Sequence, residues 1–328
     1  MDKKKSGDSL DKIFETQHIC SWDQAVAEIL DKTEISDPNK SACHPYPYIY
    51  RGARDADWKP LTNLERGYMK SDFLSKDNRA RCRKPICAYE HVQLRNFKKY
   101  AYLHTDYAST NYIDEMVIAQ HFYQHTRLLD WTVSPLVALF FATKLEDSGS
   151  HDKETDGVVW RLHHDNVRCK LPKKLKKVLE HHQGARSFTS EMLCGNTPAS
   201  SCNNSKPPYP ALNDLQECDD NALIVIDPLM LDQRLVNQAS VFTLITGSLS
   251  RIDDAHSDYR SILRECKQAS HMRWAKHKKN RKLVKRYRIR AKAKKEIREM
   301  LQLLNITPRV IFPGLEGVAR TLEDRYRT

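Results

Sequence analysis

The fold is decided by residues 126–142, which read TRLLDWTVSPLVALFFA. The part that begins at Pro135 is almost entirely apolar, and because proline suits the first turn of a helix, we expect a buried helix there. The apolar spacing of residues 113–122 predicts a second helix just upstream. The connection between these two helices therefore holds several polar and charged side chains in an apolar setting.

Two of these charged side chains, Arg127 and Asp130, allow two interpretations. Buried ionisable groups need a partner, so the two residues pair with each other or with a ligand. In the first case they form an internal brace that fixes the turn before the helix, and in the second they mark a binding site. The sequence leaves both interpretations open.

Outward from this stretch, helical and strand patterns interleave without the regular rhythm of parallel βαβ units, which indicates an α+β fold. Strands are expected at 48–52, 157–162, 222–226, 241–245 and 285–290, and further helices at 22–30, 85–103 and 291–304. Residues 1–15 are expected to be a flexible leader and residues 16–328 a single domain. The Ser-, Pro-, Asn- and Cys-rich stretch 183–218 is typical of a surface insertion.

The composition of the 328 residues, 40% hydrophobic and 29% charged, is that of a globular protein. No stretch approaches the ~20 apolar residues of a spanning helix, and no secretory signal is visible, so we expect a cytoplasmic protein without membrane contact. Nine cysteines are scattered without a paired motif, as is typical of reduced thiols. The adjacent histidine pairs at 163–164 and 181–182 do not point at a common metal, so no metal site is expected.

The formal net charge of +12 is concentrated in one segment, because residues 271–298 hold fourteen Lys and Arg and a single acid. Such a basic segment attracts polyanions and is common in nucleic-acid-binding proteins, although a solvated face or a partner-binding strip is the alternative. Trp274 and Tyr287 are candidates for stacking on an unpaired base. The candidate nucleic-acid contacts are Lys278, Lys279, Arg281, Lys282, Lys285, Arg286, Arg288 and Arg290, of which the last three share one face of the expected strand.

A separate candidate is Arg51, which follows an apolar strand and precedes Gly52. A guanidinium at a strand end can hold a phosphate bidentately, and a neighbouring glycine lets the backbone approach closely. Tyr50-Arg51-Gly52, Ala119-Gln120-His121 and the stretch 126–142 together resemble the FRG domain, named for its Phe-Arg-Gly motif, with Tyr in place of Phe. Further matches at Arg234-Leu235, Gln238, 289–297 and 311–317 extend the resemblance over residues 20–325.

More remotely, the same segments resemble the arginine–serine–glutamate class of ADP-ribosyltransferases. That resemblance implies a split β-sheet core with flanking helices, and NAD as a substrate without a metal. It implies that Arg51 and Gly52 hold the NAD phosphates and that nicotinamide stacks near Trp131 or Phe140. The neighbouring polar residues His121, Thr126 and Arg127 are grouped with the cofactor-binding residues.

Two departures from that class bear on catalysis. Asp130-Trp131-Thr132 replaces a Ser-Thr-Ser strand, and Ser240, after Gln238, takes the place of a catalytic glutamate. That glutamate would stabilise an oxocarbenium-like transition state by its charge. The expected catalytic residues are therefore Arg51, Asp130, Thr132 and Gln238, with Asp130 as the source of charge.

The resemblance does not choose between protein, DNA and RNA as the acceptor. The basic segment favours nucleic acid, and single strands, RNA before DNA, because a base atom is reachable only when it is unstacked. We therefore expect an NAD-dependent ADP-ribosyltransferase, a glycosyltransferase, that modifies nucleic acid. The alternatives are a protein-targeting transferase and a non-catalytic nucleotide- and nucleic-acid-binding module. FRG-like proteins imply a bacterial toxin or antiviral effector, with an antitoxin or chaperone as a further partner.

Overall fold

The computed structural model describes residues 10, 14–30, 47–70, 86–101, 111–145, 155–182, 185, 187–194, 222–230, 232–245 and 283–326. Most of the expected leader, most of the expected insertion and residues 271–282 of the basic segment lie outside these ranges. Within them, no helix is long and apolar enough to cross a membrane.

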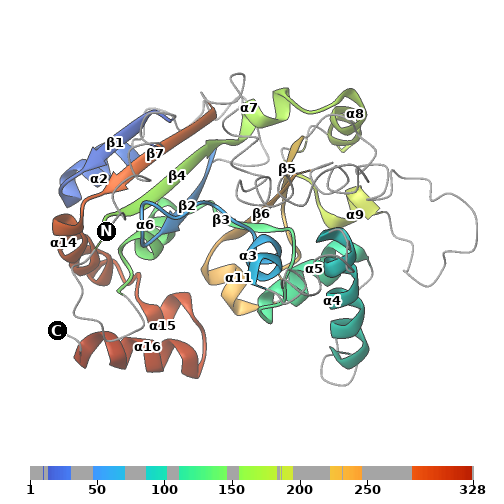
Figure 1. Ribbon diagram of the computed structural model, residues 1–328. Coiled ribbons are helices and arrows are strands. Elements are labelled where there is room, and N and C mark those ends of the chain that lie inside the picture. Colours follow the sequence, from blue (N-terminus) through green and yellow to red (C-terminus); the bar gives the residue numbers. More distant parts are fainter. Residues whose placement is uncertain are drawn as a thin grey trace, which may run out of the picture.

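One seven-stranded sheet runs through the described part of the protein (Figure 1). The strands are β1 (Thr16–Ile19), β2 (Tyr48–Ala53), β3 (Leu129–Thr132), β4 (Gly157–His163), β5 (Leu223–Ile226), β6 (Ser240–Ile245) and β7 (Val284–Ile289), in the order β1-β7-β4-β2-β3-β6-β5. β1 pairs with β7 in parallel, and the other neighbours are antiparallel. All five expected strands form. The sequence does not predict β1, and its pattern places β3 in the connection between two helices. These four-residue strands contain polar residues and lack the continuous apolar run that marks the equally short β5.

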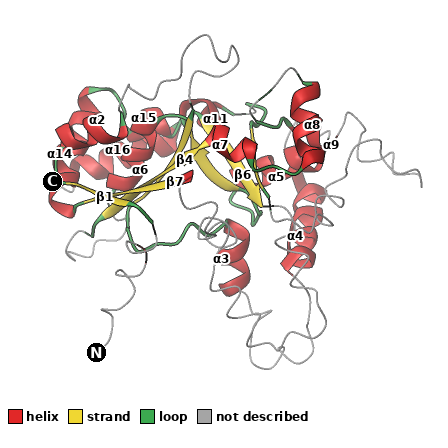
Figure 2. Ribbon diagram, turned by 90° about the horizontal axis from the view of Figure 1, so that it is seen from above, coloured by secondary structure: helices red, strands yellow, loops and turns green. Residues whose placement is uncertain are grey.

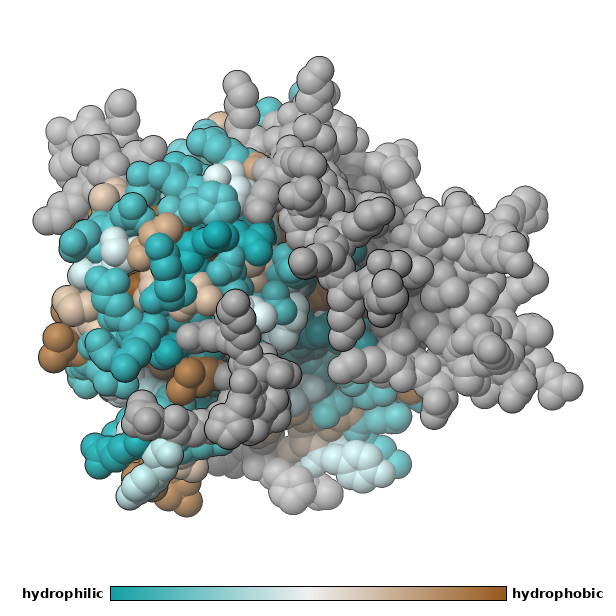
Figure 3. All heavy atoms as spheres, turned by 60° about the vertical axis from the view of Figure 1, so that its left-hand side comes forward, coloured by the Kyte–Doolittle hydropathy of each residue, from teal (hydrophilic) through white to brown (hydrophobic). Residues whose placement is uncertain are grey.

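Helices cover the sheet at both of its ends, so the predicted α+β class is confirmed (Figure 2). They are α2 (Trp22–Ile29), α3 (Asn63–Lys70), α4 (Ile86–Ala101), α5 (Tyr112–His121), α6 (Pro135–Thr143), α7 (His164–Cys169), α8 (Lys173–His181), α9 (Ser190–Cys194), α11 (Gln233–Asn237), α14 (Ala291–Leu303), α15 (Pro308–Ile311) and α16 (Leu315–Tyr326). The expected helices correspond to α2, α4, α5, α6 and α14. The surface on the α2, α14 and α16 side is mainly hydrophilic with scattered apolar residues (Figure 3). This agrees with α14, which buries Ile297 and Leu301 and exposes Lys292 and Lys295.

Two separate apolar clusters lie on one face of the sheet. The first joins α6, α2, α14 and α15 to β2, β4 and β7, and includes Val137, Tyr287 and Phe312. The second joins α4, α5, α8 and α9 to β5 and β6, and includes Val117 and Phe242. On this face the core is therefore interrupted between the two clusters, whereas on the opposite face a third cluster, which includes Ile49, Trp131 and Leu223, runs across the sheet from β4 to β5.

The sheet itself is weakest at the same place. β2 pairs with β4 over all six of its residues, and β3 pairs with β6 over all four. Between β2 and β3 the register holds one pair, Tyr50 with Thr132. The sheet therefore parts at its centre into a β1-β7-β4-β2 half and a β3-β6-β5 half.

Helix α6 lies unusually close to β2 and β4, and two glycines make this possible. A Cβ atom on Gly52 would stand 1.9 Å from the carbonyl oxygen of Ala138, and one on Gly157 would stand 2.1 Å from that of Ala142. Both oxygens belong to the helix backbone, which cannot turn aside as a side chain can. Gly52 is therefore required by helix packing, whereas the sequence interpretation attributes its value to a phosphate.

Strand β7 corrects the interpretation of the basic segment. Arg286 is fully buried, where its guanidinium lies over the ring of Trp160 and donates a 2.6 Å hydrogen bond to the carbonyl oxygen of Ala56. Burial, and then the charge of Arg288, lower the pKa of Arg286 to about 10, so it stays charged at neutral pH. Tyr287 is also fully buried. The predictions that Arg286 contacts nucleic acid and that Tyr287 stacks on a base are therefore wrong.

The two other arginines on this face are occupied by Asp156, although neither is fully buried. The carboxylate of Asp156 accepts hydrogen bonds from Arg288 Nε at 2.8 Å and Arg290 at 3.0 Å. It also accepts from the backbone N–H of Ala291, at 2.8 Å, and so caps the start of α14. Lys285 is half-buried and lies over the ring of Tyr287. The role of these arginines is thus primarily structural. The alternation in the sequence correctly places Arg286, Arg288 and Arg290 on one face of the strand, but it does not show which groups cover that face.

We expect Gly52→Ala to lower the free energy of unfolding by about 1–3 kcal/mol, because the new methyl group meets backbone that must move. Chemical denaturation measures the change. Gly67→Ala is the matched control, because the three atoms nearest to its Cβ all belong to the ring of His125, a side chain that can turn, and because alanine favours the helix. Equal effects of the two substitutions would contradict the explanation.

The Asp156 cluster should make stability depend on pH. Burial alone raises the pKa of Asp156, but hydrogen bonds from Arg288 and Ala291 and the charges of Arg290 and Arg288 outweigh it and hold the pKa below 3.8. A carboxylate with a lowered pKa stabilises the fold above its unfolded pKa and loses this effect as the pH falls through the folded value. Asp156→Asn should therefore cost about 1–3 kcal/mol at pH 7, and less as the pH falls below about 4.

The control for this experiment is Asp57→Asn. Asp57 lies 3.9 Å from the same arginine, Arg288, but is largely exposed. An exposed ion pair contributes little, so we expect a change below about 0.5 kcal/mol at every pH. Denaturation curves of both variants between pH 3 and pH 7 provide the comparison, and a pH-independent Asp156→Asn effect would refute the assignment.

Candidate functional site

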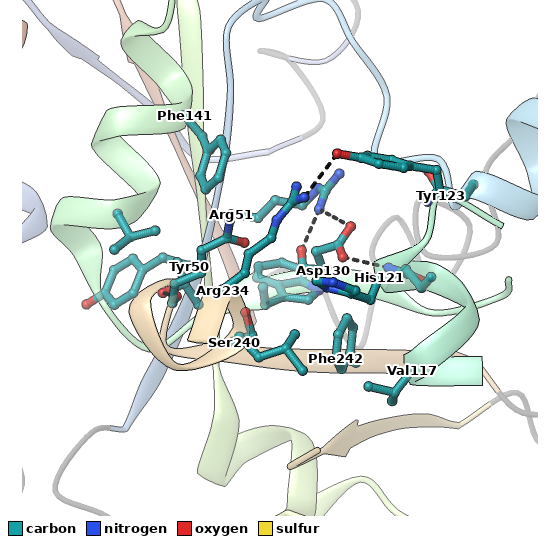
Figure 4. A pocket seen from close by; sticks show the side chains of 18 residues that line it. Tyr50, Arg51, Val117, His121, Tyr123, Asp130, Phe141, Arg234, Ser240 and Phe242 are labelled. Atoms are coloured by element: carbon teal, nitrogen blue, oxygen red, sulfur yellow. Dashed lines mark hydrogen bonds and ion pairs between the residues drawn. The ribbon is translucent and has the colours of Figure 1, made fainter. Parts of the chain in front are cut away.

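A cavity of about 280 Å³ lies where the sheet parts (Figure 4). Tyr50 and Arg51 are adjacent in β2, and successive side chains of a strand leave opposite faces, yet both line it. The cavity therefore follows the gap between the two halves of the sheet. It is lined by Tyr50, Arg51, Gly52, Asn63, Val117, Gln120, His121, Tyr123, Asp130, Trp131, Thr132, Val137, Phe141, Arg234, Leu235, Gln238, Ser240 and Phe242.

Seven residues that the sequence analysis names as catalytic or cofactor-binding come together at this cavity. They are Arg51, Gly52, His121, Asp130, Trp131, Thr132 and Gln238. They come from β2, α5, β3 and the end of α11, so residues separated by almost two hundred positions share one wall. Thr126, Arg127 and Phe140 are not among the lining residues.

The centre of the site is a chain of hydrogen bonds that starts at Arg51. Its guanidinium donates to the backbone carbonyl of Asp130 and lies 3.6 Å from the Asp130 carboxylate. The other carboxylate oxygen accepts a 2.6 Å bond from Gln120 Nε2, and the Gln120 carbonyl accepts from the Thr126 hydroxyl. Thr126 thus acts one layer behind the cavity wall. Burial lowers the pKa of Arg51, and the charge of Asp130 opposes that effect. A guanidinium nevertheless remains cationic at neutral pH.

Asp130 differs from its partners in accessibility. Its side chain is 54% exposed, whereas that of Arg51 is 17% exposed. It is also the single carboxylate among the cavity-lining residues of the described chain. A negative group that is fixed on one side by Arg51 and Gln120 and open on the other can meet a positive charge on a bound molecule.

The third strand of the site, β6, enters it through a strained turn. Ala239 has φ 45, a left-handed conformation that costs a non-glycine residue about 1–3 kcal/mol. The turn brings the carbonyl oxygen of Gln238 within 2.7 Å of the Thr132 hydroxyl, and Ser240 pairs with Thr132 across the strands. Ser240 is buried in the wall of the cavity. Gln238 Nε2 is bound to the carbonyl of Ile311 at 3.3 Å, so its amide nitrogen is directed to the C-terminal helices.

Aromatic rings form much of the remaining wall, with one exchange relative to the prediction. Trp131 lines the cavity and is held by a 2.8 Å bond from its indole N–H to the hydroxyl of Thr243. Phe140 and Phe141 both pack on Phe312, with ring centroids 6.2 and 6.1 Å apart. Of the two, Phe141 lines the cavity and Phe140 does not, because consecutive helical residues point about 100° apart. The prediction that a ligand stacks on Phe140 is therefore wrong in placing Phe140 at the cavity.

The ion pair between Arg127 and Asp130, one of the two interpretations of the sequence, does not form. Arg127 is buried and forms an ion pair with Glu90 of α4, whose side chain has no exposed surface. Glu90 also accepts a 2.9 Å bond from the Arg127 backbone N–H, and its charge helps burial to raise the pKa of Tyr112. Arg127 is therefore structural and holds α4 to the start of β3, while Asp130 belongs to the cavity. The sequence predicts the helix that contains Glu90, but no residue near Glu90 in the sequence identifies Arg127 as its partner.

Several lining residues are not named as candidates in the sequence analysis. Gln120 precedes His121 in α5, Tyr123 follows just after that helix, and Tyr50 precedes Arg51. Closeness in sequence to a named candidate could therefore have identified these three residues. Arg234 belongs to a segment that the sequence analysis matches to the FRG domain, but its place in the cavity depends on the tertiary packing of α11. Among the described residues, no group of three or more His, Cys, Asp or Glu side chains could hold a metal ion.

Comparison with known proteins gives one match. No curated protein and no solved structure matches the chain. Residues 46–151 match the family model of the FRG domain, a segment that runs from before β2 to beyond α6 and contains Arg51, His121 and Asp130. Over residues 46–151 this confirms the resemblance to the FRG domain that is read from Tyr50-Arg51-Gly52 and the stretch 126–142, and the matched segment supplies most of the cavity wall. The further matches at 234–238, 289–297 and 311–317 lie outside that segment.

Proposed function

We propose that the protein is an NAD-dependent ADP-ribosyltransferase that binds NAD in the cavity between β2 and β3. The observation that carries the proposal is the meeting of three segments on three adjacent strands. Arg51 comes from β2, Asp130-Trp131-Thr132 forms most of β3, and Gln238-Ala239-Ser240 leads into β6. These are the segments in which the sequence resembles the arginine–serine–glutamate class, in the same order along the chain.

The cavity suits the nicotinamide half of the ligand. Its volume of about 280 Å³ is at the low end of small-molecule pockets, so a whole dinucleotide would extend beyond it. Arg51 provides the cation for a phosphate, and Tyr50, Trp131 and Phe141 provide flat apolar surface for a ring. The Thr132 hydroxyl and the carbonyl of Gln238 lie where ribose or amide groups can bind.

In the proposed reaction the bond between the ribose C1′ and the nicotinamide nitrogen breaks, and nicotinamide leaves with the electron pair. The ribose becomes an oxocarbenium-like cation, which the carboxylate of Asp130 stabilises by its charge. A nucleophile of the acceptor then bonds to C1′, and its proton passes to Asp130 and on to water. Ser240 contributes a hydroxyl and no charge, so the reaction depends on Asp130.

A second function is favoured by one observation, the hydroxyl of Ser240 where the resembled class has a carboxylate. In this alternative the same cavity binds a nucleotide without cleaving it, and the protein is a binding module. The two functions share the binding step and differ in nicotinamide release.

For the acceptor we propose single-stranded nucleic acid, RNA before DNA. The support is the concentration of positive charge in residues 271–282, since the arginines of β7 serve the fold. A protein acceptor would use the same charge to dock an acidic surface. A toxin or antiviral role, with an antitoxin or chaperone as partner, remains part of the proposal through the FRG resemblance.

Substitutions at the cavity should separate binding from chemistry. Arg51→Ala should weaken NAD binding at least tenfold, because a charged hydrogen bond is worth about 1.5–3 kcal/mol. Asp130→Asn should bind NAD within about threefold of the wild type and lose nicotinamide release by about a hundredfold or more. Calorimetry and an assay of free nicotinamide measure the two effects, with the largely exposed Asp57→Asn as the control. NAD binding by the wild type without nicotinamide release would establish the binding module.

The acceptor can be tested with NAD labelled in its adenine. We expect label on single-stranded RNA, less on DNA of the same sequence, and none on mixed proteins. A variant with glutamine at Lys278, Lys279, Arg281 and Lys282 should label RNA less. The slope of the logarithm of its RNA-binding constant against the logarithm of the salt concentration should become less steep by about 0.7 for each phosphate contact that is lost. The matched control removes four lysines elsewhere, Lys170, Lys173, Lys176 and Lys177, at or next to α8. Label on protein alone would instead select the protein-targeting transferase.

A further inference from the structure

A second arginine, Arg234, lines the same cavity as Arg51. Arg234 belongs to the short helix α11 and Arg51 to β2, so the two cations reach the cavity from different elements. Figure 4 shows both side chains directed to the end of the cavity at which Tyr123 lies. The reaction proposed above uses Arg51 and leaves Arg234 without a task.

Both guanidiniums lie at a similar distance from a carboxylate, 3.6 Å from Asp130 for Arg51 and 3.7 Å from Glu316 of α16 for Arg234. Asp130 lies in the cavity wall, whereas Glu316 does not line the cavity. Arg234 also shares Glu316 with Arg320, which donates two hydrogen bonds of 3.0 and 3.1 Å to the other oxygen of that carboxylate. The lining side chains of the cavity include two arginines and one aspartate, an arrangement that favours an anionic ligand.

The position of Arg234 is set by the end of helix α5. Its guanidinium donates a 3.1 Å hydrogen bond to the hydroxyl of Tyr123, and its other side faces the ring of Phe312, 5.0 Å away. Tyr123 has φ 62, the left-handed conformation that commonly ends a helix and usually falls to glycine. His121 lies 3.6 Å from Asp232, which caps α11. Two contacts from one helix end therefore hold α11, and with it Arg234, against the cavity.

We infer that Arg234 is a second phosphate-binding residue and that the ligand class of the cavity is a pyrophosphate-bridged dinucleotide. The inference rests on the proposed function for its assumption that the cavity binds a nucleotide. One guanidinium matches one phosphoryl group bidentately, so two guanidiniums match the two groups of a pyrophosphate. A nucleoside monophosphate satisfies Arg51 alone and leaves Arg234 bound to Tyr123. Arg234 is thereby a specificity-determining residue that favours pyrophosphate-bridged ligands over nucleoside monophosphates.

The test compares ADP-ribose, which has a pyrophosphate, with AMP, which has the same adenosine and one phosphate. Both are titrated into the full-length protein by calorimetry. Arg234→Gln should weaken ADP-ribose binding at least tenfold and AMP binding less than threefold, so the preference for ADP-ribose falls by a factor of at least about three. Arg51→Gln should weaken both ligands. Arg234→Lys keeps the charge without the fork and should fall between the wild type and Arg234→Gln.

Arg320→Gln is the matched control. Arg320 contacts Glu316 and Phe312 as Arg234 does, but it is not a lining residue, so both affinities should stay within about twofold. Tyr123→Phe, which leaves the helix end intact, should reduce the ADP-ribose preference in the same direction as Arg234→Gln and serves if that variant fails to fold. An unchanged ratio of the two affinities in Arg234→Gln, with a wild type that binds ADP-ribose, overturns this inference alone. A wild type that binds neither NAD nor ADP-ribose overturns the proposed function with it.

Discussion

The close contact between β2 and α6 is the constraint from which the site follows. Helix α6 lies so near to β2 that the carbonyl oxygen of Ala138 occupies the space of a Cβ at Gly52. Only one full residue, Val133, and the N-cap Ser134 separate β3 from this helix. The chain therefore passes from β3 into the helix beside Thr132, which is where β3 still pairs with β2, whereas residues 129–131 of β3 hold no register with β2. The single pair between Tyr50 and Thr132 is what remains of their contact.

Where β2 and β3 separate, polar backbone and side-chain groups have no neighbouring strand to bind. These groups line the cavity. The backbone carbonyl of Asp130 accepts from Arg51 across the gap, and the Thr132 hydroxyl binds the backbone of Gln238. Buried polar groups are costly unless they are hydrogen-bonded, so these bonds also close the structure around the gap. The groups that form these hydrogen bonds and so stabilise the separated strands are a guanidinium, a carboxylate and a hydroxyl, and all three lie at the cavity.

The sequence predicts the parts of the site that are carried by local pattern. Arg51 and the stretch 126–142 are recognisable because a strand end, a proline-led helix and a family motif coincide there. Arg286 is misread, because alternation along a strand identifies a face but not whether solvent or the Trp160 ring covers it. Arg127 and Asp130 are correctly singled out, but their partners, Glu90 and Arg51, come from distant segments. Phe141 and Arg234 lie in segments that resemble the FRG domain, but their positions in the cavity depend on helix phase and on the packing of α11, which no short pattern contains.

Asp130 also shows how binding and chemistry are coupled in the proposed reaction. In the structure its carboxylate lies 3.6 Å from the guanidinium of Arg51 and accepts a hydrogen bond from Gln120. In the proposed reaction a phosphate that binds Arg51 takes up part of the positive charge that compensates Asp130, while the bond from Gln120 keeps the carboxylate in place. Its negative charge is then more available to a cation that forms at the ribose. Because Ser240 is neutral, the proposed reaction leaves this role to the carboxylate of Asp130, which is the single carboxylate among the described lining residues.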